Sequence, residues 1–340
     1  MKKFNIALVG YGMSGRQFHL PAFFNHPSYN VKLVQTRNEK NQMDLKAICP
    51  SARIVFDYNE ILNDDNIDLV VITASNDTHY SYSKQALLKG KHVVCEKPFV
   101  ETYEEAKELF KLAEEKNLIL RVFHNRKYDG DILTIKELMK TRDFGKLLTF
   151  SVRFDRYRPE IGDNWRFKVT TMSGLFYDLA PHLTHHVISL FGLPNSVFLN
   201  LFYEREASVA DDHFELILYY DNLVAFIGAE MFEREARPRF HLVGTKASYV
   251  KYGYDNPDSV NVKAEDLYQN SGLRSIFKTS PNEEEDIPLL RGQHYRFYDL
   301  LADHLNNGVA DDEDKRLALA VIQVMDKAMK SYQAKQIINI

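Results

Sequence analysis

A lysine fixed in front of a proline is the residue whose setting most clearly suggests chemistry in this chain. An apolar run ends at Cys95 and leads directly into Glu96-Lys97-Pro98. Proline disfavours helical backbone at the preceding residue, and it lacks the N–H that continues a strand ladder. Lys97 is therefore predicted to leave the carboxyl end of a strand, the edge of an open parallel sheet where ligands bind. An ammonium group there can stabilise a developing negative charge.

A carboxylate and an imidazole form the second such pattern. Asp178 and His182 have the i, i+4 spacing that places both on one helix face. The carboxylate can orient the ring, which can exchange a proton near neutral pH. Pro181 is compatible with this helix only if the helix begins within the preceding turn. His186 also has i, i+4 spacing from His182, but the glutamate of the zinc-protease motif is missing. We predict proton transfer without a metal; plain surface or core histidines are the alternative.

A glycine pattern near the N-terminus predicts a dinucleotide site. Gly10, Gly12 and Gly15 have G-x-G-x-x-G spacing between a predicted strand and a predicted helix. Gly10 permits a tight turn, Gly12 lets a pyrophosphate approach the backbone, and Gly15 allows close helix–strand packing. The helix N-terminus would then face the phosphates. An ordinary glycine-rich turn is the alternative.

The corner after the second predicted strand bears on the choice of coenzyme. NAD sites usually carry an acidic residue there, about 20 positions after the glycines. Here no carboxylate occurs before Glu39. Arg37 can meet a 2′-phosphate with two parallel hydrogen bonds, assisted by the Thr36 hydroxyl. We therefore predict NADP over NAD, which stays possible; the alternative is that Arg37 is only a solvated loop residue.

The elements that must position these residues differ between the two parts of the chain. In the first third, short apolar runs alternate with helical patterns, which predicts a parallel sheet covered on both faces. After about residue 124, longer runs alternate apolar with polar residues, and Asp221-Asn222 supplies a hairpin turn. The predicted strands of the first part are 4–9, 31–34, 52–56, 69–72, 92–95 and 118–123.

Helices and one irregular segment complete the predicted pattern. A helix over 102–116, with Thr102 as its N-cap, belongs to the first part. The segment 256–288, with its acidic run Glu283-Glu284-Glu285-Asp286, is predicted to be a loop. The other predicted helices are 14 onward, 80–88, 131–140, 178–191, 293–305 and 312–333, and the later strands are 147–158, 197–203, 214–220, 224–231 and 240–243.

Length and composition limit the class of protein. A chain of 340 residues favours two domains, predicted as 1–123 and 124–340. A net charge of -4 gives no reason to expect nucleic acid or an anionic membrane as partner. No apolar stretch approaches the ~20 residues of a membrane span. Two cysteines, Cys49 and Cys95, fit a reducing compartment, so a cytoplasmic location is expected.

Together these motifs resemble the glucose–fructose oxidoreductase/inositol dehydrogenase (Gfo/Idh/MocA) family over essentially the full chain. The family's order and approximate spacing are matched by the glycine pattern, Thr73-Ala74-Ser75-Asn76 with His79, Glu96-Lys97-Pro98, and Asp178 with His182. Further segments resemble a narrower branch that includes NADP-dependent scyllo-inositol dehydrogenases: His124-Asn125-Arg126, 155–159, Trp165-Arg166, Gly244-Thr245 and Lys251-Tyr252-Gly253.

The resemblance implies an α/β protein with an N-terminal Rossmann domain and a C-terminal α+β domain. The second domain is expected to contain a large, mostly antiparallel open sheet, whose free face would form a homodimer or a higher homo-oligomer. Two departures from the family pattern are present. Ala180 stands where relatives often have glycine, and His185 stands where a second aspartate is usual. The second departure puts a preference for polyols in question.

The resemblance also assigns roles to residues. Lys97 would contact substrate and the nicotinamide ribose, His182 would be the catalytic acid/base, and Asp178 would help to hold substrate. The predicted coenzyme-binding residues are Gly10, Gly12, Met13, Ser14, Gly15, Thr36, Arg37, Thr73, Ala74, Asn76, His79, Glu96 and Lys97. The predicted substrate-binding residues are Lys97, Asn125, Trp165, Arg166, Asp178 and His182.

The expected reaction is the reversible oxidation of a secondary alcohol on a sugar or cyclitol. His182 would accept the hydroxyl proton while Lys97 stabilises the alkoxide, and the coenzyme would carry the hydride. Two alternatives stay open at this point: a regulator that binds NAD(P) and a partner protein without chemistry, and a reductase of a non-sugar ligand. The intact Lys97, Asp178 and His182 argue against the regulator.

Overall fold

The chain folds into two compact units. The structure, a computed structural model, describes residues 3–161, 167, 171–206, 208–235, 237–253, 274–309 and 311–340. Unit 1 comprises Met1–Phe123 and Tyr295–Leu319, and unit 2 comprises His124–His294 and Ala320–Ile340. The predicted division assigned everything from residue 124 onward to the second domain. The compact units instead group Tyr295–Leu319 with the N-terminal segment, because helices from this late stretch pack against that segment.

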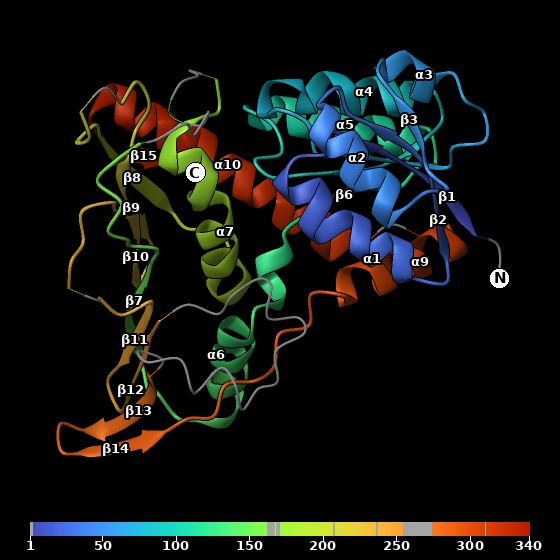
Figure 1. Cartoon of the computed structure of the whole chain (residues 1–340). Coiled ribbons are helices and arrows are strands. Elements are labelled where there is room, and N and C mark those ends of the chain that lie inside the picture. Colours follow the sequence, from blue (N-terminus) through green and yellow to red (C-terminus); the bar gives the residue numbers. More distant parts are fainter. Residues whose placement is uncertain are drawn as a thin grey trace. The chain divides into compact units, whose positions relative to one another are not determined.

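A six-stranded parallel sheet forms the centre of unit 1 (Figure 1), as the sequence predicts. Its order, β3-β2-β1-β4-β5-β6, is that of a Rossmann fold. The central strands are almost continuously apolar, and all four residues of β4 are buried, because helices cover both faces of such a sheet. The strands are β1 (Phe4–Val9), β2 (Tyr29–Gln35), β3 (Arg53–Val55), β4 (Leu69–Ile72), β5 (His92–Cys95) and β6 (Leu120–Val122).

The helices of unit 1 follow the predicted order with local differences. The helix expected from residue 14 is a π-helical turn, Gly15–His19, followed by α1 (Leu20–Asn25). At α5 (Tyr103–Glu115), Thr102 is the N-cap, and Glu105 completes a capping box. The other helices are α2 (Glu39–Ile48), α3 (Tyr58–Leu62), α4 (His79–Leu88), α9 (Arg296–Asn307) and the first part of α10 (Asp312–Ala334).

Unit 2 is built on a nine-stranded sheet, ordered β14-β13-β12-β11-β7-β10-β9-β8-β15. Only β7 and β10 pair in parallel, so the predicted large, mostly antiparallel sheet is confirmed. The strands are β7 (Leu147–Arg153), β8 (Ser196–Phe202), β9 (His213–Tyr219), β10 (Val224–Ala229), β11 (Phe240–Gly244), β12 (Ser248–Tyr252), β13 (Arg274–Ser280), β14 (Glu283–Asp286) and β15 (Ile338–Asn339).

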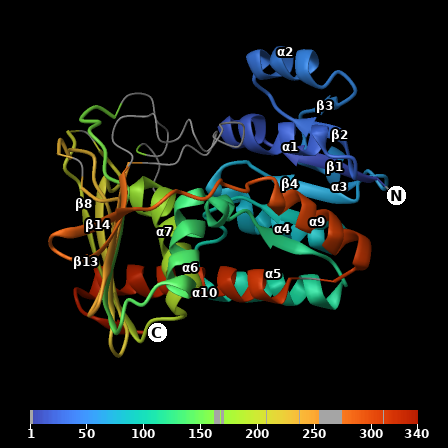
Figure 2. The ribbon, with the colours of Figure 1, turned by 90° about the horizontal axis from the view of Figure 1, so that it is seen from below.

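Two helices lie against one face of this sheet, α6 (Gly130–Thr141) and α7 (Gly174–Phe191) (Figure 2). Residues that alternate along β9 show the consequence, since Phe214 and Leu216 are fully buried while Glu215 between them is half-exposed. No described helix covers the opposite face, which we call the open face.

Two sequence expectations in unit 2 are wrong. The end of the predicted loop 256–288 forms the antiparallel pair β13–β14, and the acidic run is the strand β14 itself; residues 254–273 lie outside the described residues. As an edge strand, β14 keeps all four side chains exposed, and such charge blocks pairing with other chains. Helix α7 also begins at Gly174, so Pro181 is inside the helix and not in its first turn.

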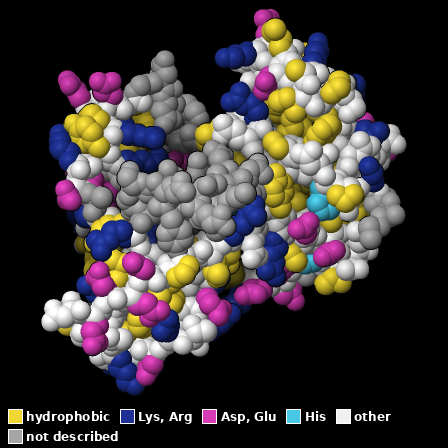
Figure 3. All heavy atoms as spheres, turned by 60° about the horizontal axis from the view of Figure 1, so that its bottom comes forward, with side chains coloured by type: hydrophobic (Ala, Val, Ile, Leu, Met, Phe, Trp, Pro, Cys, Tyr) yellow, Lys and Arg dark blue, Asp and Glu magenta, His cyan; other side chains and the backbone are white. Residues whose placement is uncertain are grey.

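Charge is mixed in sign on the face drawn in Figure 3, where lysine and arginine side chains are interspersed with acidic ones. A mixed surface of this kind keeps a protein dispersed without creating a single-sign field that would attract polyanions. Among the described residues, no helix combines the length and the apolar character needed to cross a membrane.

Candidate active site

One edge of the unit 1 sheet carries all of its predicted motif segments. Residues 10–15 follow β1, residues 36–37 follow β2, residues 73–76 follow β4, and Glu96-Lys97-Pro98 follows β5. Because these strands are parallel neighbours, their carboxyl ends lie at the same edge of the sheet. The parallel topology therefore brings together residues that are up to about 90 positions apart in sequence.

The glycine loop is closely packed on one side and open on the other. Gly10 has φ +93°, and a Cβ there would lie 2.8 Å from the carbonyl oxygen of Thr73. A Cβ on Gly15 would lie 2.8 Å from the carbonyl oxygen of Gly10, whereas one on Gly12 would have nothing within 4 Å. The Thr73 hydroxyl donates to the Gly10 carbonyl at 2.7 Å. The loop is thus fixed from below and exposes its backbone at Gly12, which fits an approaching pyrophosphate.

Glu96 connects this loop to the end of β5. Its carboxylate accepts hydrogen bonds from the Ser14 hydroxyl, from Nε2 of His19 at 3.1 Å, and from the backbone N–H of Lys97 at 3.1 Å. Burial raises the pKa of Glu96, but His19, Ser14 and the charge of Lys97 outweigh burial and lower it below its usual value. Glu96 is therefore a buried, ionised group whose oxygens are occupied by protein donors, and Lys97 follows it, half-buried, with a cis bond to Pro98.

The loops after β4 and β5 are joined by His79. Its Nδ1 lies 2.7 Å from the carbonyl oxygen of Pro98, and its Nε2 lies 3.3 Å from that of Ala74. Burial lowers the pKa of His79, which favours the neutral ring with a single N–H, placed at Nδ1 by the shorter contact. His79 thus supports the loops, whereas Asn76 is half-buried and Met13 is exposed at the same edge.

The corner after β2, where the sequence predicts coenzyme selection, presents an exposed guanidinium. Thr36 is buried and Arg37 is exposed. The Nε of Arg37 donates to the carbonyl oxygen of Phe56 at 3.3 Å, and its own carbonyl accepts from Gln42 at 3.3 Å. Asn38 then caps α2 by accepting from the Asn41 N–H at 3.0 Å. The backbone around Arg37 is therefore held, and none of the described residues accepts from its Nη groups.

In unit 2, α7 carries the predicted proton-transfer residues. Asp178 is half-buried, and His182 is 7% exposed one turn further along the same face. His185 and His186 continue this face and are buried. Pro181, between Asp178 and His182, removes one N–H donor from the helix, yet the helix continues for ten residues beyond it because its long apolar surface packs on β9 and β10.

The start of α7 is fixed by a residue that sequence reasoning did not select. The carboxylate of Asp211 accepts from the Phe176 N–H at 2.6 Å, and its carbonyl oxygen accepts from the Leu175 N–H at 2.8 Å. Gly174 has φ +82°, and a Cβ there would lie 2.1 Å from the Asp211 carboxylate. Burial raises the pKa of Asp211 to about 7, against the lowering effect of these N–H groups. No local signal reveals this cap, because the two segments are distant in sequence.

The 3-10 turn Asn125–Tyr128 packs beside α7 and brings the predicted residue Asn125 to it. The ring of His185 lies 4.7 Å from that of His124, and His186 donates from Nε2 to the Arg126 carbonyl at 3.0 Å. Burial, followed by the charge of Arg239, lowers the pKa of His186 to about 4. Burial and the neighbouring His124 also hold the pKa of His185 well below its usual value. Both rings are thus neutral at physiological pH.

A buried ion pair anchors the same turn. Asp129 accepts from Arg126 at 2.9 Å and contacts Nε2 of His294 at 2.7 Å. Burial raises the pKa of Asp129, but Arg126 and His294 outweigh it and bring the pKa to about 2. The turn is therefore tied to the segment that precedes α9. The predicted residues Trp165 and Arg166 lie outside the described residues, and Lys97 belongs to unit 1 while Asp178, His182 and Asn125 belong to unit 2.

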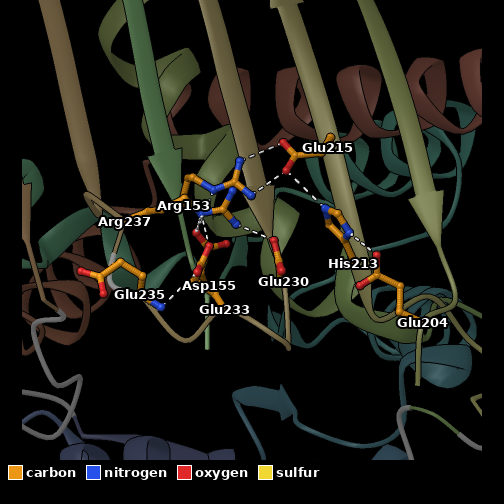
Figure 4. Close-up of polar contacts among 9 residues, drawn as sticks. All are labelled: Arg153, Asp155, Glu204, His213, Glu215, Glu230, Glu233, Glu235 and Arg237. Atoms are coloured by element: carbon orange, nitrogen blue, oxygen red, sulfur yellow. Dashed lines mark hydrogen bonds and ion pairs between the residues drawn. The ribbon is translucent and has the colours of Figure 1, made fainter. Parts of the chain in front are cut away.

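A separate charged network lies on the open face of the sheet (Figure 4). Arg153 binds both carboxylate oxygens of Glu215, at 2.9 and 2.6 Å, and donates to Asp155 at 2.8 Å. His213 bridges Glu215 at 3.3 Å and Glu204 at 3.0 Å. Burial raises the pKa of Glu215, but His213 and Arg153 outweigh it and bring the pKa to about 2. These groups are paired with one another, and within the described ranges no group of three or more potential ligands could hold a metal ion.

Family models match both parts of the chain. The model "Oxidoreductase family, NAD-binding Rossmann fold" (GFO_IDH_MocA) matches residues 4–124. The model "Oxidoreductase family, C-terminal alpha/beta domain" matches residues 136–340. The two matches together leave only short stretches of the chain uncovered.

Individual proteins are similar along most or nearly all of the chain. The scyllo-inositol 2-dehydrogenase (NADP(+)) IolW of Bacillus subtilis is 33% identical, covering 98% of this chain and 95% of that protein. The uncharacterised oxidoreductase YdgJ of Escherichia coli is 35% identical, covering 94% of this chain and 93% of its own. The levoglucosan dehydrogenase of Pseudarthrobacter phenanthrenivorans is 24% identical over 82% of this chain and 80% of that protein. Among solved structures, the oxidoreductase yvaA of B. subtilis superposes with a TM-score of 0.90 at 30% identity, covering 100% of this chain and 99% of that one.

Proposed function

Because the chain belongs to the Gfo/Idh/MocA family of NAD(P)-binding oxidoreductases, we propose that it is an NADP-dependent dehydrogenase of sugars or cyclitols. The observation that carries the proposal is the shared sheet edge of unit 1. There the glycine loop and the half-buried Lys97 meet through Glu96. A site for a dinucleotide and a group that stabilises the developing alkoxide are two of the parts that alcohol oxidation by hydride transfer uses, and a proton acceptor is the third.

The roles of the residues follow from their chemistry. The glycine loop would hold the pyrophosphate, and Thr73, Ala74 and Asn76 would line the nicotinamide half of the coenzyme. NADP supplies the hydride acceptor when it is bound. Lys97 stabilises the negative charge that develops on the substrate oxygen.

The proton is handled by the second unit. The imidazole of His182 accepts the hydroxyl proton of the substrate, and Asp178, on the same face of α7, holds the substrate hydroxyl and orients the ring. Asn125 extends the substrate-binding surface from the neighbouring 3-10 turn. We assign Trp165 and Arg166 to this surface by family resemblance alone.

A sugar or cyclitol substrate is supported by what relatives are named for. One similar protein is a scyllo-inositol 2-dehydrogenase and another is a levoglucosan dehydrogenase. In this chain α7 carries His185, a buried neutral imidazole, in place of the family's usual aspartate. An imidazole offers one donor and one acceptor where a carboxylate offers acceptors only, so we expect a different pattern of preferred hydroxyls.

The test assays each coenzyme with each member of a panel of substrates. Purified protein is incubated with NADP or NAD and with individual inositols, aldoses and anhydrosugars, and the absorbance of the reduced nicotinamide is followed. Turnover of at least one polyol with NADP is expected, together with its abolition in Lys97→Met. Binding of NADPH without turnover of any polyol, sugar or carbonyl compound would favour the non-catalytic regulator.

The preference for NADP over NAD is tested by a variant of Arg37. Arg37→Ala should raise the KM for NADP by tenfold or more, since a charge-assisted hydrogen bond is worth roughly 1.5–3 kcal/mol. The KM for NAD should be unchanged. An equal effect on both coenzymes would show that Arg37 only supports the loop through Phe56.

We also propose that the open face forms a homodimer or a larger homo-oligomer. This face combines half-exposed apolar side chains, such as Phe226 at 37% exposure, with the paired network of Figure 4. Large apolar side chains on an uncovered sheet are typical of a protein interface. Phe226→Asp should shift the sedimentation coefficient toward the monomer. The control Met43→Asp, at an exposed apolar residue of unit 1, should leave it unchanged.

A further inference from the structure

A chain of four side chains runs through the interior of unit 1. Tyr298 of α9 contacts Nδ1 of His19 at 3.2 Å, and Nε2 of His19 contacts Glu96 at 3.1 Å. Glu96 also accepts from the Ser14 hydroxyl. We propose that His19 is a positioning residue of the coenzyme site: through Glu96 it holds the glycine loop and the backbone of Lys97 in one geometry. The inference rests on the proposed function for the role of Lys97, but not for coenzyme binding.

The location of Glu96 makes it the junction of this arrangement. One of its oxygens accepts from Ser14, inside the glycine loop, and from His19; the other accepts from the Lys97 N–H. A single carboxylate therefore sets the distance between the loop and the backbone of Lys97, which carries the predicted catalytic ammonium. Catalytic groups must be held to within roughly 0.5 Å, so a shift at Glu96 would displace both partners.

His19 is suited to hold that carboxylate still. Its side chain is completely buried, and its ring lies 4.2 Å from the ring of Phe123 and 6.1 Å from that of Phe23. Aromatic packing fixes the plane of the imidazole, and the hydroxyl of Tyr298 occupies the nitrogen that faces away from Glu96. An ionised carboxylate can only accept, so the N–H at Nε2 is the one directed at Glu96. The Tyr298 hydroxyl also donates to the carbonyl oxygen of Phe18 at 3.3 Å.

Burial explains why the contact matters. Glu96 is 8% exposed and carries a charge, and a buried carboxylate that loses a donor is left with its desolvation cost uncompensated. The carboxylate would then turn toward other donors or take up a proton. Either response releases Ser14 or Lys97. His19 contacts neither the substrate nor the coenzyme in this scheme, which separates it from the catalytic residues.

The experiment compares His19→Phe, His19→Gln and a matched control. Phenylalanine keeps the ring but cannot donate, whereas the glutamine amide reaches Glu96 with an N–H. The control is His26→Gln, because His26 contacts Asp299 at 3.1 Å, the same distance as His19 to Glu96, but away from the loop. NADPH affinity is measured by nucleotide fluorescence, kcat by turnover, and the melting temperature by calorimetry.

His19→Phe should weaken NADPH binding about tenfold or more and lower kcat, the size expected from one hydrogen bond to an ionised group. His19→Gln should recover most of both, and His26→Gln should match the wild type. Tyr298→Phe, which removes only a hydroxyl, should weaken NADPH binding by a few-fold and remains informative if His19→Phe does not fold. NADPH affinity and kcat at wild-type values in folded His19→Phe and Tyr298→Phe would overturn the proposal, even if their melting temperatures fall.

Failure of the proposed function gives a different result. In that case wild-type protein binds NADPH but oxidises no polyol, and the His19 variants still differ from His26→Gln in NADPH affinity. If turnover is present and the His19 variants bind and react like His26→Gln, the dehydrogenase assignment stands and the positioning role of His19 is refuted.

Discussion

The polar interiors of the two units are organised in different ways. In unit 1, the buried carboxylate of Glu96 meets three donors, and the loops around it are tied to one another. In unit 2, His185 and His186 are buried along α7, and the Nδ1 atom of each meets no hydrogen-bond partner among the described residues. The comparison teaches that the sheet edge of unit 1 is fixed around one satisfied charge. Along α7, neutral imidazoles instead lie beside the residues proposed for proton transfer.

Replacement of His182 should have the largest effect, and it tests whether proton transfer and coenzyme binding belong to different units. If unit 2 handles the proton and unit 1 the coenzyme, His182→Asn lowers kcat by roughly 10²–10⁴-fold, the usual worth of general acid–base catalysis. The dissociation constant of NADPH should stay at its wild-type value. His241→Asn, at an exposed position of β11, serves as the control. A parallel loss of NADPH affinity would contradict the assignment of His182 to proton transfer.

Acid should destabilise unit 2 through its neutral histidines. The folded pKa of His186 is about 4, below the ordinary 6.5, so the unfolded chain takes up a proton first. This contribution to stability is complete above pH 6.5 and is lost as the pH falls toward 4. It amounts to about 3 kcal/mol for 2.5 pKa units. His186→Gln keeps a donor for the Arg126 carbonyl, so its free energy of unfolding in urea should fall less steeply over this range. If the free energies of unfolding of His186→Gln and the wild type fell equally over this range, His186 would not be the source of the acid sensitivity.

The cap of α7 tests whether the position of this helix depends on a residue distant in sequence. Asp211→Ala leaves the buried Phe176 N–H without its acceptor, which should cost about 1–3 kcal/mol of unfolding free energy. Because α7 carries Asp178 and His182, kcat should fall as well. Asp211→Asn retains an oxygen acceptor and should restore part of both. Stability loss with an unchanged kcat would show that the helix keeps its position without this contact.

Thr102 provides the corresponding cap in unit 1 and the smallest expected effect. Thr102→Ala removes the capping box of α5, which should lower the free energy of unfolding by about 1 kcal/mol. Helix α5 carries none of the proposed site residues, so kcat and the KM for NADP should not change. A kinetic effect as large as that of Asp211→Ala would remove the distinction between the two caps.

Short-range signals were sufficient for much of unit 1. The predicted ranges 69–72 and 92–95 coincide with β4 and β5, because strands buried on both faces are continuous apolar runs that end abruptly. The N-cap at Thr102 was predicted for a similar reason, since a capping box is local in sequence. By contrast, α2 escaped prediction because Leu45 is its only buried residue, which leaves no apolar stripe to detect.

Long-range pairing accounts for what sequence reasoning missed. Glu96 and Ser14 are 82 residues apart, and the cap of Phe176 by Asp211 spans 35, so neither contact leaves a local pattern. The strand β14 is a row of acidic residues that pairing with β13 makes extended, against its propensity. Packing on the sheet similarly overrides Pro181 within α7.

The late segment Tyr295–Leu319 determines when unit 1 can finish folding during synthesis. Tyr298 contacts His19 across 279 residues, and Phe297 packs on Phe123 at 4.8 Å. A ribosome therefore releases the N-terminal strands long before the tyrosine that completes their interior is made. Unit 1 is therefore completed only when residue 319 has been made, although its first strands emerge at the start of synthesis. A nascent chain interrupted before residue 295 would expose an unsealed nucleotide fold to chaperones and proteases.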